Sequence, residues 1–275
     1  MRIVIDLQAA QAENRNRGIG RLALSLAQEI SRQRGNHEVL IALNGALPDA
    51  IPTIREAFRG LLPYGAIRVW HGLENTSAVD SVNAFRREAT GLIRETFLAS
   101  LNPSILLVAS LFEGFVDSAV TSIKKIPQPY PTALILYDLI PLIYRDHYLL
   151  NEQYAAWYLQ QFEELKKADL LLCISNSSRQ EAIQWAGFQE EALATIYAGK
   201  DAHFTPAEIQ DAQKIALLNR FGLRQPFVLY GGGIDFRKNI DGLIRAFALI
   251  PAQTRNQHQL VIVCSVPSGE KARLE

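Results

Sequence analysis

Short apolar segments alternate with amphipathic stretches along almost the whole chain, and this alternation limits the possible fold more than any other feature. Most of the apolar segments are apolar on both sides, which suits a buried parallel sheet with helices on both faces. The sequence therefore predicts an α/β fold. The expected strands are 3–5, 39–43, 66–70, 105–108, 132–136, 170–174, 194–196, 227–230 and 260–263, and the expected helices are 20–34, 83–101, 152–168, 177–186, 207–221 and 241–249.

The length of 275 residues allows one large domain or two of ordinary size. Prolines 206 and 226 enclose one polar helix, and we interpret 206–226 as a connection between domains. Residues 1–205 would form a first Rossmann-like domain, and 227–275 would begin a second one. Because a piece with two strands cannot bury a core alone, we expect this second domain to be incomplete.

The charges balance, with 28 Lys plus Arg and 28 Asp plus Glu, so nothing in the composition favours a nucleic-acid partner. The five histidines show no metal-binding spacing, and we expect no metal. No apolar run approaches the roughly 20 residues that span a bilayer, and no signal peptide precedes the first strand. We expect a cytoplasmic protein. The basic amphipathic stretch 85–98 is either a solvated helix face or a peripheral contact with the membrane surface.

A glycine-rich loop follows the strand expected at 227–230. It includes Gly232 and Gly233, leads to the adjacent cations Arg237 and Lys238, and then enters a helical pattern. Successive glycines weaken a fold unless something comes close to their backbone. This order, in which a strand is followed by a glycine loop, by cations and then by the start of a helix, is typical of a phosphate-binding site. A tight turn with a solvated basic pair is the alternative.

A second glycine loop contains Gly18 and Gly20, with Arg21 after them, and opens the helix expected at 20–34. Glycines let the backbone approach a ligand, and a helix N-terminus favours negative charge. The loop lacks the glycine spacing of a dinucleotide-binding fingerprint. It is either an ordinary helix entry or part of a substrate cleft.

Polar residues also follow two central strands. Tyr137 and Asp138 follow the strand 132–136, at the edge of a parallel sheet where α/β folds bind ligands. Asp138 either contacts substrate or caps backbone amides in its turn. Ser175 follows the strand 170–174 and faces the cleft or belongs to a helix cap, for which Ser177 is the expected N-cap residue.

Taken in order, these stretches resemble the group 1 glycosyltransferases, the large retaining family with the GT-B fold of two facing Rossmann-like domains. Residues 18–21 resemble the glycine loop of that family, and 137–141 resemble its His-Asp-Leu-Ile-Pro segment. Residues 174–179 resemble its serine-rich turn, and 230–240 resemble the opening of its second domain. The order and spacing match over essentially the whole chain.

The resemblance implies that a hexose, of the mannose type, moves from a nucleotide-sugar donor to a glycan or lipid-linked acceptor in surface polysaccharide or lipopolysaccharide biosynthesis. It also implies retention of configuration, with neither an obligatory metal nor another cofactor. Cations and backbone donors would then stabilise the leaving diphosphate. The candidate catalytic residues are Lys238, Arg237 and Asp138, and the candidate donor- or substrate-binding residues are Gly18, Gly20, Arg21, Tyr137, Ser175, Gly232 and Gly233.

The chain departs from the family pattern at two of these positions. Gly233 stands where the family often has an arginine, so we assign that role to Arg237. Tyr137 stands where the family commonly has a histidine; it can donate a hydrogen bond to a sugar hydroxyl but does not protonate near neutral pH.

The paired-glutamate motif of the family would lie beyond Glu275, so we expect a piece or a truncated form of a longer protein, inactive by itself. A relative that binds a glycan or a partner without catalysis is the main alternative. Another Rossmann-type enzyme, using a dinucleotide or a methyl donor, is the third reading.

Overall fold

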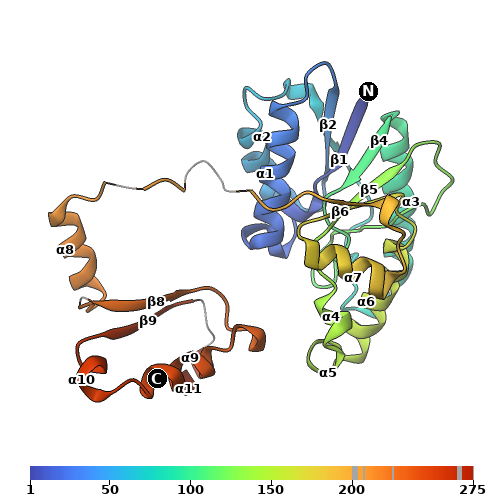
Figure 1. Cartoon of the computed structure of the whole chain (residues 1–275). Coiled ribbons are helices and arrows are strands. Elements are labelled where there is room, and N and C mark those ends of the chain that lie inside the picture. The colour runs from blue at the N-terminus through green and yellow to red at the C-terminus, as the bar shows by residue number, and fades with distance from the viewer. Residues whose placement is uncertain (200–203, 207, 225, 265–267, 275) are drawn as a thin grey trace. The chain divides into compact units, whose positions relative to one another are not determined.

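The structure is a computed structural model that describes residues 1–199, 204–206, 208–224, 226–264 and 268–274. The chain divides into two units, Met1–Asp201 and Ala202–Glu275 (Figure 1). The segment 206–226, predicted as a connection, falls in the second unit and contains the helix α8 (Asp211–Arg220).

The first unit is built on a seven-stranded sheet in the order β3-β2-β1-β4-β5-β6-β7, and all its strand pairs are parallel. The predicted α/β class is confirmed. Each strand lies within one residue of its predicted bounds, because each is a compact apolar run. The strands are β1 (Arg2–Asp6), β2 (Glu38–Asn44), β3 (Ile67–Trp70), β4 (Ile105–Val108), β5 (Thr132–Leu136), β6 (Leu170–Cys173) and β7 (Leu193–Thr195).

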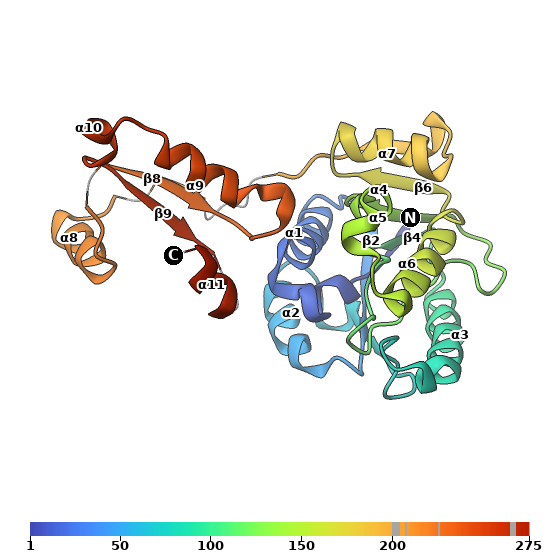
Figure 2. The same cartoon turned by 90° about the horizontal axis from the view of Figure 1, so that it is seen from below.

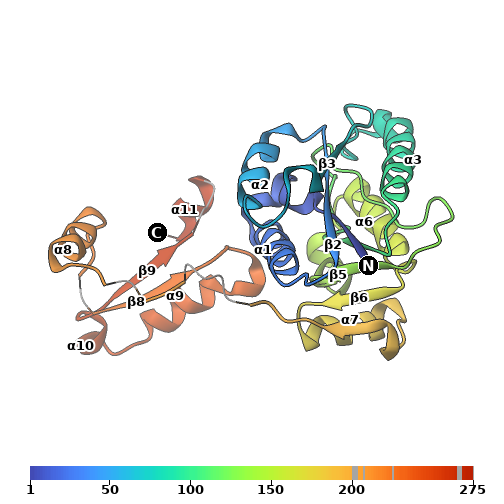
Figure 3. The same cartoon turned by 90° about the horizontal axis from the view of Figure 1, so that it is seen from above.

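Helices cover both faces of this sheet. Side chains alternate between the faces along a strand, so neighbouring residues of β1 enter different cores. Val4 joins the core under α3, α6 and α7, whereas Ile5 joins the core under α1 and α2 (Figure 3). The helices are α1 (Gly18–Arg32), α2 (Ile51–Ala57), α3 (Ala84–Ser100), α4 (Ile140–Ile143), α5 (Arg145–Tyr148), α6 (Glu152–Leu165) and α7 (Asn176–Ala186).

Two arginines of α3 point into the protein, which differs from the basic helix face expected over 85–98. Arg94 is fully buried and pairs with the buried carboxylate of Asp6, with 2.7 Å between Arg94 Nε and Asp6 Oδ2. Arg87 donates to backbone carbonyls, including that of Gly114 at 2.8 Å. A buried charge needs a partner of this kind. Because these partners come from distant segments, the charge pattern of the sequence wrongly predicted that both side chains face the solvent.

The second unit contains two parallel strands, β8 (Phe227–Gly231) and β9 (Gln259–Val263), with α9 (Ile240–Ala248) and α10 (Ala252–Arg255) between them in sequence (Figure 2). α11 (Ser268–Leu274) follows β9. The helix predicted at 207–221 begins later, at Asp211, and its predicted first residue, Ala207, lies outside the described residues. None of the helices within the described ranges is both long and apolar enough to cross a membrane.

Candidate active site

The order in which the chain adds strands to the first sheet reverses between β1 and β4, although all the strands run parallel. The chain passes from β1 to β2 on one side, and from β4 to β5 on the other. In open α/β sheets, ligands bind outside the carboxyl ends of the strands at such a switch point. Two of the predicted motifs meet here: the glycine loop at the start of α1 and the turn that follows β5.

Tyr137 joins these two motifs. Its hydroxyl oxygen lies 3.2 Å from the carbonyl oxygen of Ile19 in the glycine loop and 3.1 Å from that of Ala109 after β4. Burial, together with the nearby Glu113 carboxylate, holds the pKa of Tyr137 well above its usual range. The hydroxyl has a single proton to donate. In this structure the proton is donated to one of these two carbonyls, and the hydrogen bond to a sugar hydroxyl that the sequence suggested stays a prediction.

The two glycines of the first loop have different surroundings. Gly20 is buried, and a Cβ atom there would come within 2.4 Å of the Arg15 Cα atom. The absence of a side chain at Gly20 is therefore required by packing of the chain on itself. A Cβ at Gly18 would meet no atom within 4 Å. Gly18 and Arg21 are exposed, and the Arg21 side chain has no hydrogen-bond or ionic partner among the described residues.

Glu113 is a site residue that the sequence did not reveal. Only 2% of it is exposed, and it accepts hydrogen bonds from Ser110 Oγ at 3.0 Å and Asn14 Nδ2 at 3.4 Å. Burial raises the pKa of this carboxyl to about 7. The only sequence signal is a single acidic residue in the otherwise apolar stretch after β4, and its partner Asn14 lies 99 positions away.

Asp138 and Ser175 have the capping roles that the sequence left open as alternatives. Asp138 Oδ1 accepts a hydrogen bond from the Ile140 amide at 3.1 Å, at the start of α4. Ser175 is the N-cap residue of α7 and forms a capping box with Ser178. The expectation that Ser177 is the cap was wrong, because the helix begins at Asn176 and places Ser177 inside its first turn.

The glycine loop of the second unit follows β8 as predicted. Gly231 ends the strand, and Gly232 has a φ of 158°. The Tyr230 hydroxyl donates to the carbonyl oxygen of Gly233 at 2.6 Å and closes the loop. A Cβ at Gly233 would meet no atom within 4 Å, so packing within the described chain does not require glycine there.

The two cations after this loop differ in their partners. Arg237 Nε lies 2.7 Å from Asp235 Oδ1, so part of its charge is offset. The exposed side chain of Lys238 forms no hydrogen bond or ion pair with the rest of the described chain. Both residues belong to a short 3-10 turn, Phe236–Lys238, that precedes α9.

The structure thus brings Tyr137 to the glycine loop of Gly18 and Gly20, and it places Gly232, Gly233, Arg237 and Lys238 together in the second unit. Across the residues that it describes, no three His, Cys, Asp or Glu side chains are grouped so as to hold a metal ion.

No protein family model matches the chain. Among curated proteins, a serotype-specific mannosyltransferase WbdA of Escherichia coli is 30% identical over 275 residues, which is 100% of this chain and 33% of the relative. The O-antigen chain mannosyltransferase B of Escherichia coli is 31% identical over 101 residues, which is 36% of this chain and 26% of that protein. The chain spans about a third of the length of the WbdA relative.

Two solved structures share the fold. HepE of Anabaena in complex with UDP matches with a TM-score of 0.54 and 14% identity, over 98% of this chain and 62% of that one. The lipopolysaccharide outer core galactosyltransferase WaaB matches with a TM-score of 0.57 and 13% identity, over 100% of this chain and 64% of that one.

The sheet and these likenesses confirm the GT-B type of fold that the sequence predicted. Within that class, the chain is similar along its whole length to the mannosyltransferase WbdA, as the resemblance to the group 1 glycosyltransferases predicted.

Proposed function

We propose that this chain belongs to a glycosyltransferase that moves a hexose of the mannose type from a nucleotide-sugar donor to a growing surface polysaccharide. The observation that carries the proposal is the 30% identity to a WbdA mannosyltransferase over all 275 residues. The partial match to an O-antigen chain mannosyltransferase supports the same acceptor class.

The second unit would contribute the groups that stabilise the departing nucleoside diphosphate. Negative charge grows on that group as the glycosidic bond breaks, and preorganised cations lower the barrier most. Lys238 is exposed and unpaired within the described chain, and it follows an open glycine loop. Arg237, held by Asp235, would add a second and weaker contact. With these cations in place, we propose a reaction that needs no bound metal.

The first unit would contribute the loop at the sheet switch point. The exposed Gly18 and Arg21 lie in the first turn of α1, whose N-terminus favours negative charge. Tyr137 would act by fixing the position of this loop through the Ile19 carbonyl.

We propose retention of the anomeric configuration, by kinship with the group 1 enzymes. We place the reaction in the cytoplasm, with peripheral contact at the inner face of the membrane.

Donor binding tests this proposal. Calorimetric titrations of the full-length protein to which this chain belongs, with nucleotide-activated mannose, nucleotide-activated glucose and free mannose, should give measurable affinity for at least one nucleotide sugar and none for the free sugar. If neither nucleotide sugar binds and no hexose is transferred to a mannan acceptor, the proposal is wrong. The anomeric configuration of the product, read by NMR, decides between retention and inversion.

A further inference from the structure

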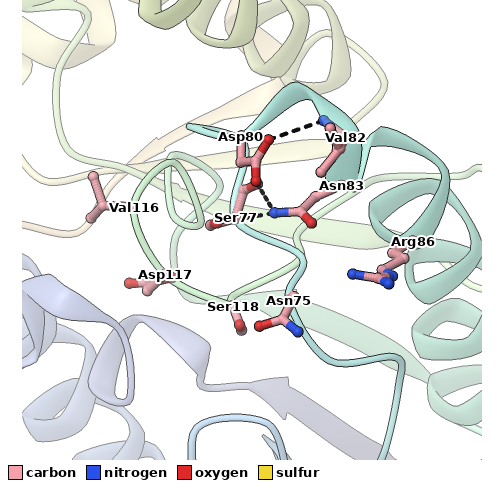
Figure 4. A pocket seen from close by; sticks show the side chains of 9 residues that line it. All are labelled: Asn75, Ser77, Asp80, Val82, Asn83, Arg86, Val116, Asp117 and Ser118. Carbon is pink, nitrogen blue, oxygen red and sulfur yellow. Dashed lines mark hydrogen bonds between the residues drawn. The ribbon is translucent and has the colours of Figure 1, made fainter.

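A polar cavity lies in the first unit, and its lining residues are not among those assigned to the candidate site above. It has a volume of about 480 Å³ and is lined by residues from the connection between β3 and α3, from the first turn of α3, and from the connection between β4 and β5 (Figure 4). Sites for small molecules generally measure about 300–1,000 Å³. The cavity is therefore large enough to hold a small polar ligand.

The two walls of the cavity are held together by backbone hydrogen bonds. The amides of Ala78 and Val79 donate to the carbonyls of Gly114 and Phe115, at 3.0 and 2.8 Å. The Thr76 hydroxyl donates to the Ser118 carbonyl at 3.1 Å.

The Arg87 guanidinium reinforces this connection, because its Nη1 atom donates to carbonyls of both walls, Thr76 at 3.2 Å and Gly114 at 2.8 Å. A ligand would then meet a site that is already formed, which lowers the cost of binding.

Three hydrogen-bonding side chains of the lining have no partner within the described chain. They are the Asn75 amide, the Ser118 hydroxyl and the Arg86 guanidinium (Figure 4). Val82 and Val116 add apolar surface, and they are 76% and 58% exposed. Free donors and acceptors beside exposed apolar side chains suit a ligand that has both hydroxyl groups and carbon-bound hydrogens.

The charges of the lining select against an anion. Asp80 and Asp117 supply two carboxylates against the single guanidinium of Arg86. Both carboxylates are fixed by backbone amides: Asp80 by Val82 at 3.2 Å, and Asp117 by Ala119 at 2.9 Å and Glu13 at 2.6 Å. A phosphate or carboxylate placed here would lie near two negative charges, which disfavours it.

We propose that this cavity binds a neutral saccharide unit of the acceptor glycan. The inference rests on the proposed glycosyltransferase function and adds a location and a charge class for part of its acceptor. The bond between the Glu13 amide and the Asp117 carboxylate connects the cavity to the segment that precedes the glycine loop. An acceptor chain held here would lie on the same edge of the sheet as that loop.

The test is a calorimetric titration of the protein with an unphosphorylated α-linked manno-oligosaccharide. Arg86→Ala should weaken binding by about tenfold, the effect of losing one charge-assisted hydrogen bond. Asn75→Gly removes the side-chain amide, and glycine tolerates the φ of 55° at this position, so this variant should fold and should also bind more weakly. Arg68→Ala is the matched control, because Arg68 is exposed on β3 and does not line the cavity, and it should leave the affinity unchanged.

Unchanged affinity in both Arg86→Ala and Asn75→Gly would overturn the cavity assignment. Tighter binding of the same oligosaccharide carrying a terminal phosphate, or of the protein to phosphatidylglycerol vesicles in an Arg86-dependent way, would overturn the neutral class. Failure of the proposed function can be distinguished from failure of the cavity assignment, because in that case the unmodified protein would bind no nucleotide sugar. The cavity variants should leave donor affinity unchanged.

Discussion

The Tyr137 hydroxyl oxygen lies 3.2 Å from the carbonyl oxygen of Ile19, a residue 118 positions earlier in the chain. Ile19 lies between Gly18 and Gly20, so the end of β5 fixes the position of the glycine loop at the start of α1. The same hydroxyl reaches the Ala109 carbonyl after β4. One side chain thus connects three segments at the switch point of the sheet.

Replacing Tyr137 by Phe should lower the free energy of unfolding by about 1–2 kcal/mol, because the carbonyls of Ile19 and Ala109 lose a donor. Urea denaturation of both proteins measures this difference. Tyr64→Phe is the control, since Tyr64 is 78% exposed, and it should change stability little. Equal stability of the Tyr137→Phe and Tyr64→Phe variants would show that the Tyr137 contacts contribute nothing.

The two glycines of this loop should respond oppositely to alanine. At Gly20 the new Cβ would come within 2.4 Å of the Arg15 Cα atom, so Gly20→Ala should cost about 2 kcal/mol or more in stability. At Gly18 the Cβ meets open space, and alanine at this helical position should be neutral or stabilising by up to about 1 kcal/mol. Thermal unfolding of both variants provides the comparison. Similar losses at the two positions would contradict the packing described.

Glu113 should give the protein a pH-dependent loss of stability. Its pKa is raised from 4.5 to about 7 in the folded state, which therefore holds the proton more firmly than the unfolded chain does. The cost of ionising this buried carboxyl is absent below about pH 4.5, grows between about pH 4.5 and 7, and is complete above pH 7. The groups that interact with it are Ser110, Asn14, Asp117, Tyr137 and Tyr154.

Glu113→Gln removes this titration. Relative to the unmodified protein, the variant should gain stability as the pH rises through that window, by at most about 3 kcal/mol above pH 7. The measurement is the free energy of unfolding at several pH values, with Glu191→Gln, at an exposed position, as the control. Parallel curves for Glu113→Gln and the unmodified protein would exclude the proposed titration.

Most of the fold could be predicted from the sequence, and the reasons are visible in particular elements. β5 is buried at all five positions, so its apolar run marks it clearly. α2 was missed because it has only seven residues and carries a proline at its start. α3 was predicted correctly as a helix, but the inward direction of Arg94 depends on its partner Asp6, 88 positions away.

The candidate site was predictable only where it lies in short motifs. The glycine loops and the turn at Asp138 are local in sequence. The structure places Gly18 and Gly20 in the first turn of α1, the second glycine loop at the end of β8, and Asp138 just after β5. The connection of Tyr137 to Ile19 and of Glu113 to Asn14 arises from contacts between distant segments. The spacing of residues along the sequence does not predict such contacts, because they depend on how the strands are ordered in the sheet.

The two cations of the second unit should differ in their importance for donor binding. Lys238→Ala should weaken nucleotide-sugar affinity by about tenfold or more, as expected for a lost charged contact to a diphosphate. Arg237→Ala should have a smaller effect, because Asp235 already offsets part of its charge. Lys214→Ala, at an exposed position of α8, is the control. Equal nucleotide-sugar affinities of the Lys238→Ala and Lys214→Ala variants would show that Lys238 does not contact the donor.

Hexose transfer itself tests the central claim most directly. The full-length protein to which this chain belongs is incubated with nucleotide-activated mannose and a mannan oligosaccharide, and mass spectrometry follows the acceptor. We predict products extended by whole hexose units, together with release of the nucleoside diphosphate and loss of both signals in Lys238→Ala. An acceptor that stays unextended with every nucleotide-activated hexose, in a protein that folds and binds the oligosaccharide, would contradict the account.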